Sequence, residues 1–136
     1  MSELPAWLCR RNTESWEGVL RFYDHLLSQR GWEWVAPVAR VARRLADSEA
    51  RQAFRAGQSM WRLIVSTAEH YGLSDEDAFL MCEPLEDGRI RLEYRSPTGE
   101  SSVAGPFQGE GVIAEVEERL NALASVRRPV SEVEPA

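Results

Sequence analysis

The sequence contains no lysine, and all sixteen of its basic residues are arginine. Schiff-base catalysis and phosphate binding by a P-loop both need a lysine amine, so the sequence excludes both. The motifs of serine hydrolases (GxSxG), zinc proteases (HExxH) and dithiol redox centres (CxxC) are also missing. No apolar run approaches the roughly 20 residues that a membrane-spanning helix needs. No membrane association and no cofactor are therefore expected.

Cysteine and histidine are scarce, with two residues of each. Cys9 and Cys82 have no partner at the spacing of a zinc site, and two distant cysteines are typical of small buried side chains rather than a disulfide. His25 is expected on the solvent-facing side of a helix. A catalytic triad that depends on histidine is therefore disfavoured.

One short stretch, AEHYGLSDEDAF at residues 68–79, gathers a histidine, hydroxyl groups and four carboxylates. Gly72 suits the left-handed residue that ends a helix, and His70 would meet the negative end of that helix dipole. Ser74 would cap the next segment, with carboxylates in its first turn. We interpret the stretch as the end of a helix over 60–71, and no metal site is expected.

The charge is unevenly distributed along a chain whose net charge is −6. Residues 1–68 hold ten arginines and seven carboxylates, whereas residues 69–136 hold six arginines and fifteen carboxylates. A strongly acidic half disfavours nucleic acid as a ligand and is compatible with a basic protein partner. The first residues, MSELPAWLCRR, carry acid before arginine, the reverse of a secretory signal, so a cytoplasmic protein is expected.

The hydrophobic periodicity predicts an α+β fold, with a helical N-terminal half packed on a small antiparallel β-meander of about three strands and a closing C-terminal helix. The first helix is expected to begin with Asn12 as its N-cap and to end at Gly31. Residues 37–57 are helical by propensity, as one helix or as two with a break near Asp47. A helix is also predicted over 60–71, with a strand over WRLIVS as the competing interpretation.

After Asp77 the period changes from 3.6 to 2. The segments AFLMCEP, RIRLEYR and SSVAGPF are expected to be strands, separated by the turns LEDGR and SPTGE. A closing helix is predicted from about Glu110 to Val126. Residues 1–127 should therefore form a single domain, and residues 128–136 a flexible tail that has little to bury.

Four arginines, Arg40, Arg44, Arg51 and Arg55, follow one another at spacings of 4, 7 and 4. On one straight helix they would form a stripe about 60° wide, suited to an anionic ligand or a phosphate backbone. The apolar residue Phe54 would then share that face, although one face cannot be both the stripe and the core. The helix is therefore expected to break, and the stripe to be partly an effect of spacing.

Tryptophan is abundant, with five residues in the chain. Trp32 and Trp34 are two positions apart, so in an extended segment they would share one face, either closing the core or forming an aromatic wall for a partner. Together with Trp7 they are the predicted anchors of a protein interface. The acidic residues Glu115 and Glu118 on the closing helix are expected to steer a basic partner toward them.

The leading hypothesis is therefore a non-enzymatic, acidic protein-binding module, comparable with bacterial immunity proteins, secretion chaperones or adaptors. Its partner would be another protein, and a homodimer is also considered. The alternative is an arginine-assisted binder of an anionic ligand or nucleic acid. An enzyme with a carboxylate-based site is the least favoured hypothesis, because every catalytic motif sought is missing.

Overall fold

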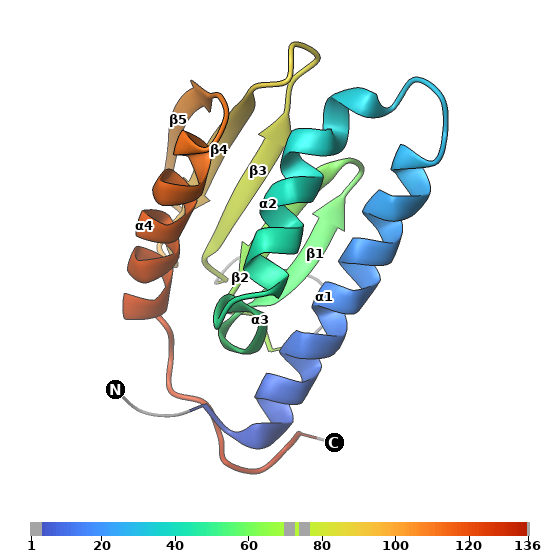
Figure 1. Ribbon diagram of the computed structural model, residues 1–136. Coiled ribbons are helices and arrows are strands. Elements are labelled where there is room, and N and C mark those ends of the chain that lie inside the picture. Colours follow the sequence, from blue (N-terminus) through green and yellow to red (C-terminus); the bar gives the residue numbers. More distant parts are fainter. Residues whose placement is uncertain (1–3, 70–72, 74–76, 136) are drawn as a thin grey trace.

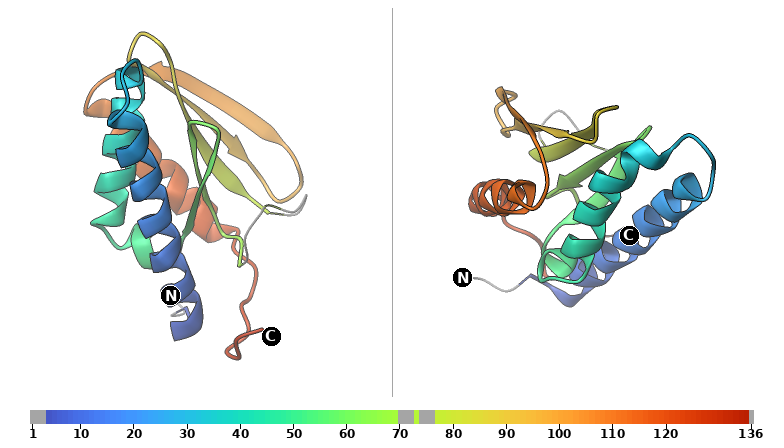
Figure 2. Two further views of the ribbon diagram at one scale, coloured as in Figure 1. Left: turned by 90° about the vertical axis from the view of Figure 1, so that its right-hand side faces the viewer. Right: turned by 45° about the horizontal axis from the view of Figure 1, so that its top comes forward.

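The protein folds into two layers, with helices on one face of an antiparallel sheet, in a computed structural model that describes residues 4–69, 73 and 77–135. The sheet has five strands in the order β1-β2-β3-β4-β5, so each strand pairs with its neighbour in sequence. Helices α1, α2 and α4 lie side by side over this sheet (Figures 1 and 2). The predicted α+β fold is confirmed, although the sheet has more strands than expected. No helix in the described ranges is long and apolar enough to cross a membrane.

Helix α1 spans Ala6–Leu27 and begins earlier than predicted. The carbonyl oxygen of Pro5 accepts the backbone N–H groups of Leu8 and Cys9, so the helix starts directly after this proline. Asn12 is not a cap: its side chain is 1% exposed, and its Nδ2 atom donates to the carbonyl oxygen of Gln52 over 2.7 Å. This long-range hydrogen bond gives the buried Asn12 nitrogen an acceptor, so Asn12 lies within the helix rather than at its start.

The chain after α1 forms a single 3₁₀ turn, η1 at Glu33–Val35, and then the helices α2 at Ala36–Ala46 and α3 at Ala50–Ala53. The predicted break near Asp47 is confirmed. The helical region also ends earlier than expected, because Phe54 is extended and leads directly into the first strand.

Strands β1 (Arg55–Ser59) and β2 (Arg62–Ser66) form a hairpin, so the predicted helix over 60–71 is wrong and the competing strand interpretation is correct for residues 62–66. Leu63 and Val65 alternate with more exposed neighbours and face the core. Pairing with strands on both sides decides this segment, where local propensity favoured helix and strand about equally.

The predicted strands of the second half are confirmed as β3 (Phe79–Pro84), β4 (Ile90–Arg95) and β5 (Ser101–Phe107). Their connecting turns each contain a glycine at positive φ, Gly88 and Gly99, as the turn sequences indicate. Helix α4, at Gly111–Ser125, closes the fold as predicted.

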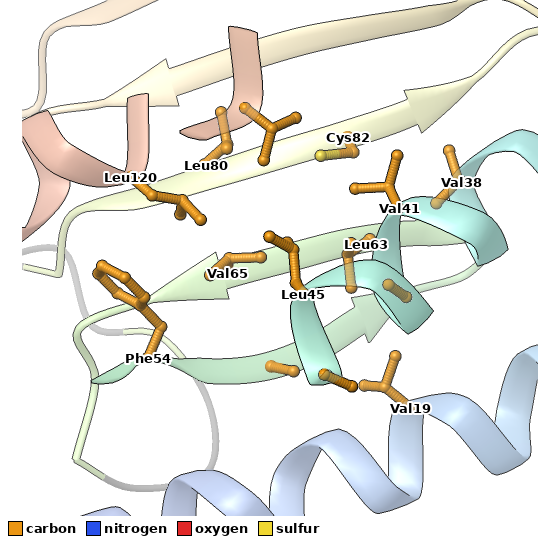
Figure 3. Packing of buried hydrophobic residues seen from close by; sticks show 14 of the residues in the cluster. Val19, Val38, Val41, Leu45, Phe54, Leu63, Val65, Leu80, Cys82 and Leu120 are labelled. Carbon is orange, nitrogen blue, oxygen red and sulfur yellow. The ribbon is translucent and has the colours of Figure 1, made fainter. Parts of the chain in front are cut away.

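The core lies between the sheet and the helix layer, as Figure 3 shows from close by. Every element contributes apolar side chains to it; the residues labelled in Figure 3 are Val19, Val38, Val41, Leu45, Phe54, Leu63, Val65, Leu80, Cys82 and Leu120. Trp16 is also fully buried, and its indole N–H donates to the carbonyl oxygen of Phe54 over 3.0 Å. Helix α1 is thereby fixed against the start of β1.

The C-terminal segment runs beside the first turns of α1 (Figure 1). The indole N–H of Trp7 donates to the carbonyl oxygen of Ser131 over 2.9 Å, and Glu134 forms ion pairs with Arg10 and Arg11 at 3.2 Å. The flexibility of residues 128–136 stays a prediction, and these contacts join the segment to α1 at Ser131 and Glu134.

Candidate functional site

Three of the five tryptophans meet at one place on the surface. Trp32 and Trp34 stack with ring centroids 5.7 Å apart and planes 25° apart. Trp61 meets the edge of Trp34 at 5.7 Å and lies 6.2 Å from Trp32. All three are half-buried, packed against the core on one side and open to solvent on the other. Together with Met60 they form what we call the tryptophan surface.

Two separate segments build this surface. Trp32 directly precedes the 3₁₀ turn η1 and Trp34 lies within it, so the two do not share an extended segment. Their side chains nevertheless lie on the same side of the chain, because their rings stack. Val35, which is fully buried, fixes the segment to the core.

Trp61 belongs to the hairpin between β1 and β2, whose two-residue loop is Met60–Trp61. The sequence did not indicate this member of the site, since a two-residue hairpin usually signals itself by glycine or asparagine at positive φ. Met60 takes a φ of +59° instead, a conformation that is strained for a bulky side chain. It is also 63% exposed.

The hairpin is held firmly from two sides. The phenol of Tyr23, on α1, donates a hydrogen bond to the carbonyl oxygen of Trp61 over 2.9 Å. The guanidinium of Arg62 lies 5.4 Å from the ring centroid of Trp61 and forms an ion pair with Glu83 at 2.9 Å. The tryptophan surface therefore rests on a rigid part of the fold.

Trp7, the third predicted anchor, does not belong to this surface. It lies in the first turn of α1, whereas Trp32 follows the end of that helix, and 22 helical residues span about 33 Å. Trp7 is also only 5% exposed, and its indole N–H is already bonded to the tail. The structure therefore brings together two of the three predicted anchors and adds Trp61.

The predicted acidic residues also lie elsewhere. Glu115 and Glu118 are on α4, and α2 lies between that helix and α1 (Figure 1). The Oε2 atom of Glu115 is 2.6 Å from the guanidinium of Arg119, one turn further along. These carboxylates can act on a partner only through the overall field of the protein.

The four arginines of the alternative hypothesis are distributed over three elements. Arg40 and Arg44 are on α2, Arg51 on α3 and Arg55 at the start of β1. Arg51 is paired with Glu17 on α1 at 3.3 Å. The stripe therefore does not exist as one face.

Arg40 and Arg44 do line a cleft of about 410 Å³ between α2 and the start of α4. Arg43, Asp47 and Glu110 line the same cleft, so its lining holds three arginines and two carboxylates. Arg43 is itself paired with Asp24 on α1 at 2.7 Å. The cleft therefore concentrates little net positive charge, which does not favour an anion site.

Burial suppresses the ionisation of the two most enclosed titratable groups. Desolvation raises the pKa of the Cys82 thiol to about 12, and it raises the pKa of the Tyr23 phenol well above its usual range. Neither group forms a thiolate or phenolate near neutral pH, so neither is suited to nucleophilic catalysis.

The stretch at residues 68–79 was predicted to contain the end of a helix over 60–71. That prediction is wrong, because residues 62–66 form the strand β2. His70, Gly72 and Ser74 lie outside the described residues, so their predicted capping roles are not tested. Among the residues that the structure describes, no three side chains of histidine, cysteine, aspartate or glutamate gather in a way that could hold a metal ion.

Comparison of the chain with protein-family models, with curated proteins and with solved structures found no match. The functional conclusion therefore rests on the fold and on the tryptophan surface alone.

Proposed function

We propose that this protein is a non-enzymatic protein-binding module whose partner docks on the tryptophan surface. The observation that carries the proposal is the convergence of Trp32, Trp34 and Trp61, three half-buried indoles from two segments, beside the exposed Met60. Tryptophan is enriched at the energetic centres of protein interfaces, and methionine adapts its shape to a partner's apolar groups.

The local energetics support this role. A left-handed backbone at a residue other than glycine costs roughly 1–2 kcal/mol, and Met60 carries that cost at an exposed position where it fills no core space. Strain of this kind tends to collect at functional sites. Met60 precedes Trp61 in the hairpin loop, and its exposed side chain, whose sulfur accepts a hydrogen bond from Arg62 over 3.9 Å, adds apolar area that a partner could bury.

The negative net charge of the protein favours a basic partner. The net charge of −6 gives the molecule a negative field that favours the approach of a positively charged protein. Small acidic immunity proteins, secretion chaperones and adaptors work in this way, by binding one protein without chemistry. The likeness to these classes is one of size, charge and surface type.

Site-specific photo-crosslinking in the cells that make the protein tests this proposal. A photoreactive phenylalanine analogue replaces Met60, and a matched protein carries it at Val133, an exposed apolar position in the tail. The position-60 protein should form a covalent adduct with one defined partner, identified by mass spectrometry, and the position-133 protein should not. The adduct should disappear when Trp34 is also replaced by alanine. Equal adducts at both positions, or none at position 60, would contradict the proposal.

A further inference from the structure

The two edges of the sheet are treated differently by the fold. At the β1 edge, Ser15 on α1 accepts the backbone N–H of Ala56 through its hydroxyl oxygen at 2.9 Å, and Trp16 donates to the carbonyl of Phe54. Helix α1 therefore covers the beginning of this edge, whereas Gln58 and Ser59 at the end of β1 are exposed. Strand β5 is the other edge, and within the described part of the chain no strand pairs with its outer side. It forms the outer margin of the sheet in Figures 1 and 2.

The hydrogen bonding of the turn before β5 determines which backbone groups of this strand face outward. The N–H of Ser96 donates to the carbonyl of Glu100 over 2.9 Å, so these two residues form a hydrogen-bonded pair. Bonded and non-bonded pairs alternate along an antiparallel ladder. In the register Arg95↔Ser101 and Glu93↔Val103, the N–H and C=O groups of Ser101 and Val103 therefore point away from β4.

The first four side chains of β5 do not hinder the pairing of this edge with another strand. The strand SSVAGPF contains no charged residue, and Val103 is 57% exposed. Exposed edge strands are usually blunted by charge, by proline or by a covering segment, because their free backbone groups pair readily with another strand. In β5 only the far end is interrupted, where Gly105 has a φ of +96° and Pro106 follows.

We propose that two copies of this chain associate through β5, with the segments Ser101–Val103 paired antiparallel about a two-fold axis that passes beside Ser102. The N–H and C=O groups of Ser101 in one copy then bond with those of Val103 in the other, and the reverse pair is generated by the axis. The sheet continues across both copies.

A second copy fits this edge better than an unrelated peptide. A two-fold axis pairs an antiparallel strand with itself, so every outward donor meets an acceptor without any further sequence requirement. The absence of charge on β5 means that two identical strands do not repel each other. The dimer leaves the tryptophan surface free, since that surface lies at the β1–β2 hairpin, at the opposite side of the sheet.

Sedimentation equilibrium of the full chain over a wide concentration range tests the proposal. The wild-type protein should fit a monomer–dimer equilibrium. Val103→Pro should be monomeric with an unchanged circular dichroism spectrum, because the N–H it removes faces outward and proline is tolerated at such edge positions. Val103→Lys should also be monomeric, since it places like charges close together across the axis.

Two further variants act as controls. Val103→Thr keeps a β-branched, uncharged residue and should leave dimerisation intact, and Met60→Ala should do the same. A wild-type protein that stays monomeric at every concentration would overturn the proposal. So would dimerisation that survives in both Val103→Pro and Val103→Lys, or that is lost in Met60→Ala, because the contact would then lie elsewhere.

Discussion

Tyr23 and Trp61 are joined by a hydrogen bond of 2.9 Å from the phenol oxygen to the backbone carbonyl oxygen. Tyr23 is 1% exposed and belongs to α1, whereas Trp61 stands at the tip of the β1–β2 hairpin. This bond ties the tryptophan surface to the longest helix of the fold. A surface held in this way loses little conformational entropy when a partner binds, because its indoles are already ordered.

Replacing Tyr23 with phenylalanine should lower the free energy of unfolding by about 1–3 kcal/mol, because the carbonyl of Trp61 loses its buried donor. Urea denaturation followed by far-UV circular dichroism measures the change. Tyr94→Phe is the matched control, since the Tyr94 hydroxyl forms no hydrogen bond with the residues that the structure describes. Equal losses in both variants would show that the Tyr23 bond contributes nothing specific.

Replacing Met60 with glycine should stabilise the isolated protein by about 0.5–1 kcal/mol, since relief of a left-handed conformation outweighs the added freedom of the unfolded chain. Ser59→Gly, at the neighbouring strand position, should instead destabilise it. Chemical denaturation of both variants decides this, and a loss of stability in Met60→Gly would show that the φ of +59° carries no strain.

Stability should fall at alkaline pH through Cys82. Burial raises the pKa of its thiol from 9.0 in the unfolded chain to about 12 in the folded protein. The folded state therefore holds its proton longer, and the stabilisation present below about pH 9 is lost progressively as the pH rises toward about 12. Tyr23 acts in the same direction.

Urea denaturation as a function of pH should show this decline, with a shallower slope in Cys82→Ala. Val65→Ala is the control, because it also shortens a buried core side chain but removes no titratable group, and it should keep the wild-type slope. A Cys82→Ala variant with the full wild-type pH dependence would mean that other groups cause the decline.

Truncation after Arg127 should lower the melting temperature by a few degrees, in contrast to the expectation from sequence. Removing the tail takes away the acceptor of the Trp7 indole N–H, a hydrogen bond worth about 1 kcal/mol when one partner is buried. Glu134→Gln should have almost no effect, because exposed ion pairs contribute little. An unchanged midpoint in the truncated protein would show that the tail contributes no stability.

The second half of the fold was predictable because its signals are local. The alternation of apolar and polar residues in β4 fixed both its strand character and its buried face, and Gly88 and Gly99 marked the turns on either side. The break in the arginine stripe was predictable for a similar reason, since Phe54 required a core position that a continuous helix could not give it.

The first hairpin was not predictable, because its determinants are tertiary. β1 has the sequence RAGQS, which contains no β-branched or aromatic residue, and it is a strand because β2 pairs with it and α1 covers its edge. Met60 gives no turn signal. Without that hairpin, the position of Trp61 beside Trp32 and Trp34 could not be foreseen.

Asn12 is a second case, this time in a helix, where a tertiary contact decides the structure and the local sequence does not. Its residue type favours an N-cap, yet its amide nitrogen donates to the carbonyl oxygen of Gln52, 40 positions along the chain. A local interpretation of the sequence therefore started α1 too late and left Trp7 outside the helix.

The most direct test is the affinity for the partner identified by crosslinking, measured by isothermal titration calorimetry with wild type, Trp34→Ala and Val133→Ala. Circular dichroism first establishes that each variant is folded at the temperature used. If the tryptophan surface is the binding site, Trp34→Ala should weaken binding by about 30-fold or more, equivalent to about 2 kcal/mol, while Val133→Ala binds like the wild type. An unchanged dissociation constant for a folded Trp34→Ala would contradict the assignment of this surface to partner binding.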